Sequence, residues 1–139
     1  MLDFADFLTG IKDLKLVIDH MAHLHFEDGL DQPQAKWIIE RLKNDENWWM
    51  LCSNGNRDSR MERDYLDAVP FGHAFIAAAP DRMVWGSDWP HTWYMEAANK
   101  GTGAIVPGFA DLIAPVVRAL PDEKIRQTIF SDAPAMLCA

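Results

Sequence analysis

Side chains able to transfer protons or to bind anions follow each of three short apolar runs in the chain. Asp19 and His20 follow the first run, the polar turn Ser53–Arg57 follows the second, and Asp88 and His91 follow the third. Carboxylates and imidazoles are common proton-transfer groups in enzymes, and the planar fork of arginine suits carboxylate ligands. If the three runs are parallel strands, we expect these side chains to face one another across one rim.

The three apolar runs are typical of strands that are buried on both faces of a parallel sheet. They cover residues 16–18, 48–52 and 83–85. From His20 to Cys52 is 32 residues and from Cys52 to Ser87 is 35, about the size of a βαβ step. The sequence therefore predicts an α/β fold with a mainly parallel sheet, formed by a single domain over residues 1–139.

Four segments between and after these runs favour helices. Residues 34–43 place Trp37, Ile38 and Leu42 on one helical stripe, with charged residues opposite. Residues 60–79 contain a helical region that we expect to be interrupted near Pro70, because proline disfavours the helical conformation in the residue before it. Residues 109–120 and the stretch from Pro121 onward complete the predicted helices, since proline and acidic residues suit a first helical turn.

Charge and hydropathy argue against several classes of partner. The 139 residues carry 21 Asp and Glu against 13 Lys and Arg, a formal net charge of -8, and no basic run is present to follow a phosphate backbone. No apolar run approaches the ~18 residues of a membrane span, and the N-terminus lacks the pattern of a signal peptide. We expect a cytoplasmic protein that acts on a small molecule, not on nucleic acid or a membrane.

Covalent catalysis is not expected at the end of the second run. Cys52 and Cys138 lie far apart in a chain too large to need a disulfide staple, so both are predicted to be free thiols. Cys52 ends an apolar run, and Ser53 beside it lacks the GxSxG pattern of a nucleophile elbow. Neither residue is therefore predicted to be a nucleophile.

The segment Val84–His91, VWGSDWPH, resembles the C-terminal signature of amidohydrolase-related proteins, especially the branch of 2-pyrone-4,6-dicarboxylate hydrolases and sugar lactonases. The resemblance spans nearly the whole chain, with further matching segments at Val17–Met21, Ser53–Arg57, 77–82 and Asp132–Leu137. It implies the C-terminal part of a TIM (β/α) barrel. A closed barrel needs about 250 residues, so roughly half of it would be absent from this chain.

The resemblance also implies roles for individual residues. Asp88 would activate water for attack on the carbonyl of an ester or lactone, with His20 in the same pocket. Arg57 and His91 would bind the carboxylates of a carboxylated ring. Trp85 and Trp89 near the rim are expected to desolvate the carboxylate in part. These expectations describe a lactonase-like hydrolase.

A metal requirement stays open in this interpretation. The HxH pair of the family's early strand has no counterpart before Leu16, and the HxH letters at His23–His25 follow the strand instead of opening the barrel. We therefore transfer no metal role to them. A divalent ion such as zinc and metal-free catalysis are equally compatible with the sequence. An apparent cluster of possible ligands is more simply a polar loop: His20, His23, His25, Glu27 and Asp28.

Each site residue also has a plain structural alternative. Asp88 could cap a turn or a helix, His20 could be a core histidine, Arg57 could be solvated and His91 could be a loop residue. The tryptophans are mostly core residues by type, with Trp89 and Trp93 alone close enough to the rim to form pocket walls.

A second hypothesis comes from another functional class. The chain could be a truncated, non-catalytic barrel fragment that acts only by association with a complementary chain or with itself. Open sheet edges and an uncovered barrel interior would favour such association, including a homo-oligomer.

Overall fold

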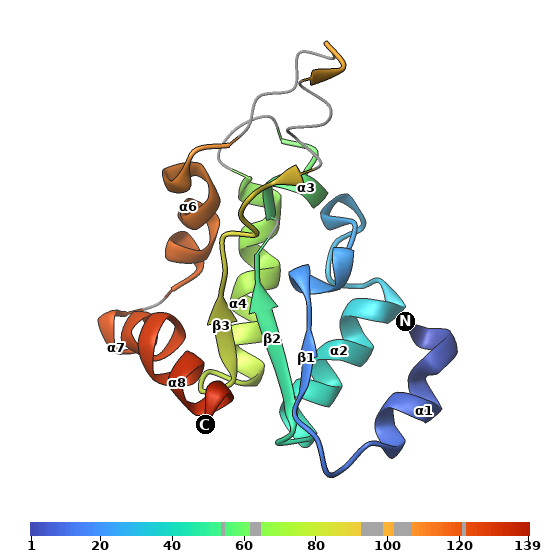
Figure 1. Cartoon of the computed structure of the whole chain (residues 1–139). Coiled ribbons are helices and arrows are strands. Elements are labelled where there is room, and N and C mark those ends of the chain that lie inside the picture. Colours follow the sequence, from blue (N-terminus) through green and yellow to red (C-terminus); the bar gives the residue numbers. More distant parts are fainter. Residues whose placement is uncertain (54, 62–64, 93–98, 102–106, 121) are drawn as a thin grey trace.

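Three parallel strands form the centre of the protein (Figure 1). The computed structural model describes residues 1–53, 55–61, 65–92, 99–101, 107–120 and 122–139. The strands are β1 (Leu16–Ile18), β2 (Trp48–Cys52) and β3 (Met83–Trp85), in the order β1-β2-β3. Both pairings are parallel, so the α/β class, the strand positions and their direction are confirmed.

Helices α2 (Pro33–Asn44) and α4 (Val69–Ala78) cover one face of the sheet and lie behind it in Figure 1. The amphipathic spacing of α2 explains its orientation, because its buried residues are Ala35, Ile38 and Leu42. Trp37 is partly buried, and its ring meets that of Trp48 edge-on at 5.3 Å between centroids. The predicted helix at residues 34–43 is confirmed.

The expected interruption near Pro70 is wrong, because a helix begins there. A 3-10 turn, Leu66–Ala68, leads into α4, and Pro70 lies in the first turn of that helix. Proline loses no intrahelical hydrogen bond at this position, and its fixed φ suits the start of a helix. Phe71 and Phe75 then follow at helical spacing, both of them buried in the core.

The chain after β3 supplies the remaining helices. These are α6 (Phe109–Ala119), α7 (Glu123–Gln127), a π-helical turn (Thr128–Asp132) and α8 (Ala133–Cys138). The Asp122 side chain caps α7 by accepting a hydrogen bond from the Ile125 backbone N–H at 2.9 Å. Pro121, which we expected in this first turn, lies outside the described residues.

The other face of the sheet carries a smaller apolar cluster. Trp49 and Val84 are buried there against Ala133 and Leu137. This cluster and the core on the α2 side explain why β2 reads as a continuous apolar run: it is covered on both faces. On the neighbouring edge strand, Val17 is 43% exposed.

Short elements complete the chain outside the three strands and the long helices. They are 3-10 turns at Leu2–Phe4, His20–His23 and Phe26–Asp28, and the short helices α1 (Ala5–Gly10) and α3 (Gly55–Asp58). Phe4, which precedes α1, and Phe7, which lies within it, are 64% and 69% exposed. Among the described residues, no helix combines the length and apolarity that a membrane crossing requires.

Arg82 joins the amino ends of β2 and β3 to the end of α2. Its side chain is 12% exposed. Nη1 donates to the carbonyl oxygens of Asp45 at 2.7 Å and Trp48 at 3.0 Å, and Nη2 donates to that of Leu42 at 2.7 Å. The Leu42 carbonyl belongs to the last turn of α2, where helical partners are lacking, so the guanidinium satisfies a group that the helix leaves open.

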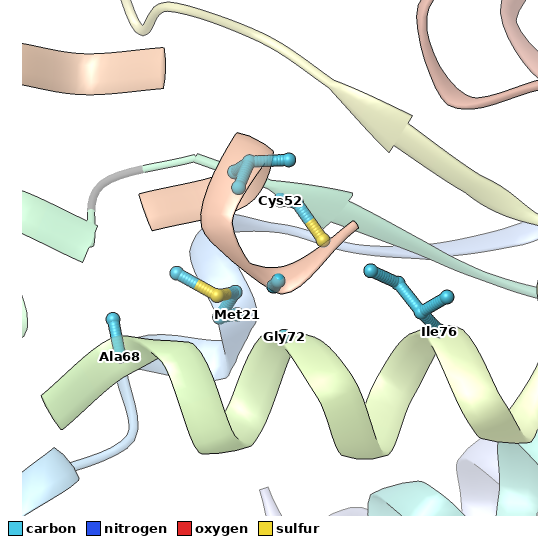
Figure 2. Close-up of a pocket in the computed structure, with 7 residues that line it drawn as sticks. Met21, Cys52, Ala68, Gly72 and Ile76 are labelled. Atoms are coloured by element: carbon cyan, nitrogen blue, oxygen red, sulfur yellow. The ribbon is translucent and has the colours of Figure 1, made fainter. Parts of the chain in front are cut away.

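A small apolar cavity of about 10 Å³ lies between α4, α6 and the carboxyl end of β2 (Figure 2). Helices α4 and α6 approach closely beside it: a Cβ added to Gly72 would stand 2.8 Å from the Ala119 Cβ. The absence of a side chain at Gly72 therefore permits this packing. The cavity is lined by Met21, Cys52, Ala68, Gly72, Ile76, Val116 and Ala119.

Candidate active site

His20, Ser53 and Asp88 meet at the carboxyl end of the sheet, which is the upper end in Figure 1. Each follows a different strand. The His20 Nδ1 and the Ser53 Oγ are 2.6 Å apart, and the His20 Nε2 lies 3.6 Å from the Asp88 Oδ1. The second distance is too long for a hydrogen bond but brings the imidazole and the carboxylate into direct electrostatic contact. The expected meeting of His20 and Asp88 is thus observed.

Solvent reaches this group of side chains from the Asp88 end. The side chains of Asp88 and His20 are 34% and 20% exposed, whereas Ser53 is 4% exposed. His20 is therefore not enclosed as a core histidine. A small molecule approaching the rim would meet the carboxylate first and the serine hydroxyl last.

The turn that carries His20 has an unusual backbone. His20, Met21, Ala22 and His23 all have positive φ, from 47° to 61°. This left-handed conformation costs roughly 1–2 kcal/mol for each residue that has a Cβ. Tertiary contacts must hold such a turn, and strained turns of this kind are concentrated at functional sites.

Several contacts hold the left-handed turn in place. Met21 is buried at 3% exposure and lines the cavity of Figure 2. The His23 Nδ1 lies 3.1 and 3.2 Å from the two carboxylate oxygens of Asp58 on α3. The Ala22 backbone N–H donates to the Asp19 carbonyl at 2.7 Å. The turn is therefore fastened to the core, to α3 and to the end of β1.

Asp88 also has a left-handed backbone, with φ 59°. The His91 N–H donates to the Asp88 carbonyl at 3.0 Å, and the Trp89 N–H donates to the Ser87 Oγ at 3.3 Å. Aspartate is one of the few residues with a Cβ that tolerates this conformation readily. Within the described part of the chain, the partner of its carboxylate is His20.

His91 and Arg57 lie on segments that follow β3 and β2. His91 lines an open pocket of about 510 Å³ beside the end of β3. Arg57 lies on α3, directly after β2, with an exposed side chain. Their expected binding of substrate carboxylates stays a prediction. The open pocket is lined by Ser87, Trp89, Pro90, His91, Pro107, Phe109 and Leu112.

The tryptophans near the rim differ from one another. Trp85 stacks edge-on against Phe109 and Phe130, with centroid distances of 5.4 and 5.8 Å, so it belongs to the packing beside α6. Trp89 is 80% exposed and lines the open pocket. Trp93, the other expected pocket wall, lies outside the described residues. The expected desolvation of Asp88 by Trp85 and Trp89 stays a prediction.

Cys52, beside Ser53, has no character of a nucleophile in this fold. Burial raises the pKa of the Cys52 thiol to about 12, so the thiolate is scarce at neutral pH. Cys138 is exposed, and both cysteines are free thiols, as predicted.

The described residues do not supply the ligand set of a metal ion. Among them, no group of three or more His, Cys, Asp or Glu side chains is arranged to hold one. His23 is paired with Asp58, Glu27 with Arg60 at 3.3 Å, and the His20 Nδ1 with Ser53. The His20 Nε2 faces the Asp88 carboxylate at 3.6 Å and the Asp19 carboxylate at 3.8 Å, and among the described residues these side chains are not arranged as a metal-binding group. We derive no step through a metal ion.

Comparison with known proteins places the chain in a family. The family model described as amidohydrolase matches residues 1–137. The chain belongs to the amidohydrolase family. This confirms the resemblance carried by the segment Val84–His91.

Two curated relatives of this amidohydrolase are named for lactones. The chain is 35% identical over 138 residues to the 4-sulfomuconolactone hydrolase of Rhizobium radiobacter, covering 95% of the chain and 44% of the relative. It is 30% identical over 139 residues to the D-galactarolactone isomerase of Agrobacterium fabrum, covering 99% and 44%. This amidohydrolase chain therefore spans less than half the length of the curated relatives that it matches.

A solved structure agrees with this assignment. The crystal structure of an Agrobacterium tumefaciens protein in its apo form matches 98% of this chain and 45% of its own, with a TM-score of 0.77 and 26% sequence identity. The described α/β arrangement thus has a close structural counterpart.

The sequence placed Ser53 in the polar turn at the rim, but its contact with His20 was not predicted. The single chemical role weighed for it was that of a nucleophile, which was rejected for lack of a nucleophile elbow. One signal was available: Ser53 is the first residue after β2 and His20 is the second residue after β1, and the carboxyl ends of adjacent parallel strands meet at one edge.

Proposed function

We propose that this amidohydrolase chain carries part of the active site of a hydrolase that opens a lactone or similar cyclic ester, with Asp88 as the general base. One observation carries the proposal: His20 and Asp88, from separate strands, meet 3.6 Å apart at the solvent-open carboxyl end of a parallel sheet. Residues 1–139 would fold as one unit and form the last strands of a (β/α) barrel, in which reactive residues occupy that end.

The distance between His20 and Asp88 suits an oxygen atom bound to both. An oxygen about 2.8 Å from each group can contact the Nε2 and the Oδ1 together when they are 3.6 Å apart. A water molecule held there gives its proton to the carboxylate as its oxygen attacks the lactone carbonyl. The ring C–O bond then breaks, and the proton passes from Asp88 to the leaving oxygen. The products are the ring-opened hydroxy acid and the regenerated carboxylate.

Binding of the substrate would use the flanking residues. The Arg57 guanidinium can form two parallel hydrogen bonds with a substrate carboxylate, and His91 can contact a second anionic group from the opposite loop. The open pocket beside His91 has Trp89 as an apolar wall for a ring. A lactone bearing carboxylate or sulfonate groups fits this combination best. A cytoplasmic setting agrees with the two free thiols.

Two reactions have to be distinguished, because one curated relative is named a hydrolase and the other an isomerase. The Asp88 carboxylate can also take a proton from one ring position and return it to another without adding water. A second functional class, the non-catalytic fragment, is favoured by the 43% exposure of Val17 on an edge strand.

The first test is lactone turnover by the purified chain and its Asp88→Asn variant. The panel contains 2-pyrone-4,6-dicarboxylate, a muconolactone and a sugar-acid lactone, each with and without added zinc. Proton NMR of the products separates a ring-opened acid from an isomerised lactone. We expect ring opening by the native chain and its loss in the variant. Equal turnover by the variant would contradict the role of Asp88.

The non-catalytic alternative makes a different prediction for the same samples. A folded chain that turns over no lactone, with or without zinc, would favour it. Sedimentation of that chain would then show whether it associates with itself.

A further inference from the structure

We propose that Ser53 is the positioning residue of this site: its buried hydroxyl donates a hydrogen bond to the Nδ1 of His20 and thereby directs the Nε2–H toward Asp88. The kinetic consequence rests on the proposed function. The hydrogen bond itself does not, because it can be measured in the resting protein.

The geometry of Ser53 suits a fixed anchor. It directly follows β2, and its backbone N–H donates to the Leu51 carbonyl at 3.2 Å. Its side chain is almost fully buried at 4% exposure and lies 2.6 Å from the imidazole nitrogen. A buried hydroxyl needs a partner, and the partner that the structure provides is the Nδ1 of His20.

The surroundings of the other imidazole nitrogen decide the direction of this hydrogen bond. The Nε2 faces two carboxylates, with the Asp88 Oδ1 at 3.6 Å and the Asp19 Oδ2 at 3.8 Å. A neutral imidazole protonated on Nδ1 would turn a lone pair toward both negative groups. Protonation on Nε2 avoids this repulsion and leaves Nδ1 as the acceptor. Ser53 is then the donor.

The same three residue types form the triad of serine hydrolases, but their exposure is reversed here. A nucleophilic serine must be accessible to a carbonyl carbon, and its aspartate is the buried member. In this chain Ser53 is 4% exposed, whereas the Asp88 side chain is 34% exposed. The reacting end is therefore the carboxylate, and the serine lies at the supporting end.

An anchor is needed because His20 begins the left-handed turn. Its ring is attached to a backbone with φ 48°, and the next three residues share the same strained conformation. The neighbouring His23 is held by Asp58, which fixes the far end of the turn and not the His20 ring. Small errors in the orientation of such a group lower catalytic rates strongly.

The test is nitrogen NMR of the His20 ring at about pH 9, well above the ordinary imidazole pKa of about 6.5. The protein carries 15N-labelled histidine, and His20 is assigned as the resonance lost in His20→Gln. We expect the native protein to carry the proton on Nε2, with a hydrogen-bonded Nδ1. Ser53→Ala should move the Nδ1 resonance to the unbonded position and introduce the other tautomer, and Ser53→Thr should restore the native spectrum.

Ser59→Ala is the matched control, because Ser59 also donates a side-chain hydrogen bond, to Asp67, and has no described contact with His20. It should leave the His20 resonances unchanged. The proposal is overturned if the native ring is protonated on Nδ1, if folded Ser53→Ala keeps the native spectrum, or if Ser59→Ala changes it equally. Should Ser53→Ala not fold, the native and Ser53→Thr spectra still decide.

Kinetics adds a second readout in a preparation that turns over a lactone. Ser53→Ala should lower kcat by about 10–100-fold, by analogy with loss of the hydrogen-bond partner of a metal-ligating histidine, with a much smaller change in KM. A raised KM with native kcat would contradict a positioning role. If the purified chain turns over no lactone, the kinetic readout is absent and the NMR result decides the positioning role alone.

Discussion

The two ends of the sheet differ in how their polar groups are satisfied. At the amino end, Arg82 donates to three carbonyl oxygens within 3.0 Å, and the Asn47 amide donates to those of Ile11 and Leu14 at 2.9 and 3.1 Å. At the carboxyl end, the backbone is left-handed at His20–His23 and at Asp88, and the Asp88 side chain is 34% exposed. Stability is concentrated at one end and reactive groups at the other.

This difference has a physical basis. Hydrogen bonds that a charged guanidinium gives to partly buried carbonyls stabilise a fold, because removing the donor leaves those carbonyls without a partner. Strained turns and exposed charges stabilise nothing by themselves, and they persist where the rest of the structure holds them. Substitutions at the two ends should therefore separate activity from stability.

Asp88→Asn should have the largest effect, and on activity alone. Loss of a general base lowers turnover by roughly 10²–10⁴-fold. Asparagine also tolerates a left-handed backbone, so the free energy of unfolding should change by less than about 1 kcal/mol. Lactone kinetics and urea unfolding on the same preparation measure both. A large loss of stability would contradict the separation of the two ends.

The reaction rate of the Cys52 thiol measures how well the carboxyl end of β2 is protected from solvent. Burial raises the pKa of its thiol to about 12, against 9.0 for an ordinary cysteine, so native Cys52 should react with a thiol reagent about 10³-fold more slowly than exposed Cys138. The Cys138→Ser variant isolates the slow thiol. Fast labelling of Cys52 in the native protein at pH 8 would show that the packing around the cavity between α4 and α6 opens.

The same pKa shift predicts the sign of a pH effect on stability. Between about pH 9 and 12 the unfolded chain loses the Cys52 proton while the folded chain retains it. The unfolded state then binds fewer protons, so the free energy of unfolding falls as the pH rises through this range. Below pH 9 the contribution is constant. Cys52→Ala should remove this part of the alkaline slope, as measured by urea unfolding.

Arg82→Met should lower stability by about 2–4 kcal/mol, because three carbonyls lose a charged donor. The His20 nitrogen resonances should stay in place in the folded variant, since the change is at the opposite end of the strands. Arg126→Met, at an exposed position in α7, is the matched control and should cost about 0.5 kcal/mol or less. Similar losses of stability in the two variants would contradict the anchoring role of Arg82.

Ala22→Gly should have the smallest effect and an unusual sign. Glycine relieves the strain of φ 61° but increases the entropy of the unfolded chain, so a net gain of about 0.5 kcal/mol is expected. Ala110→Gly, the same change at an exposed position in α6, should cost about 0.5–1 kcal/mol. Thermal unfolding compares them. Destabilisation by both would show that the turn at His20 is not strained.

Local patterns were sufficient for much of the fold. The three apolar runs form strands at the predicted residues. In β2 the apolar run is continuous because apolar clusters cover both faces of the strand. The amphipathic stripe of α2 was equally local. Pro70 was misread, because the rule for the residue before a proline was applied where the competing preference of proline for a first helical turn prevails.

The sequence by itself determined the α/β class, the parallel strands and the meeting of His20 with Asp88, since alternating strands and helices bring strand ends to one edge. Only the tertiary structure decided which side chains satisfy one another there. The pairing of His20 with Ser53 joins residues 33 apart, and the Arg82 contact with Leu42 joins residues 40 apart. Such contacts, and the left-handed turn that they hold, depend on distances between elements that no local pattern encodes.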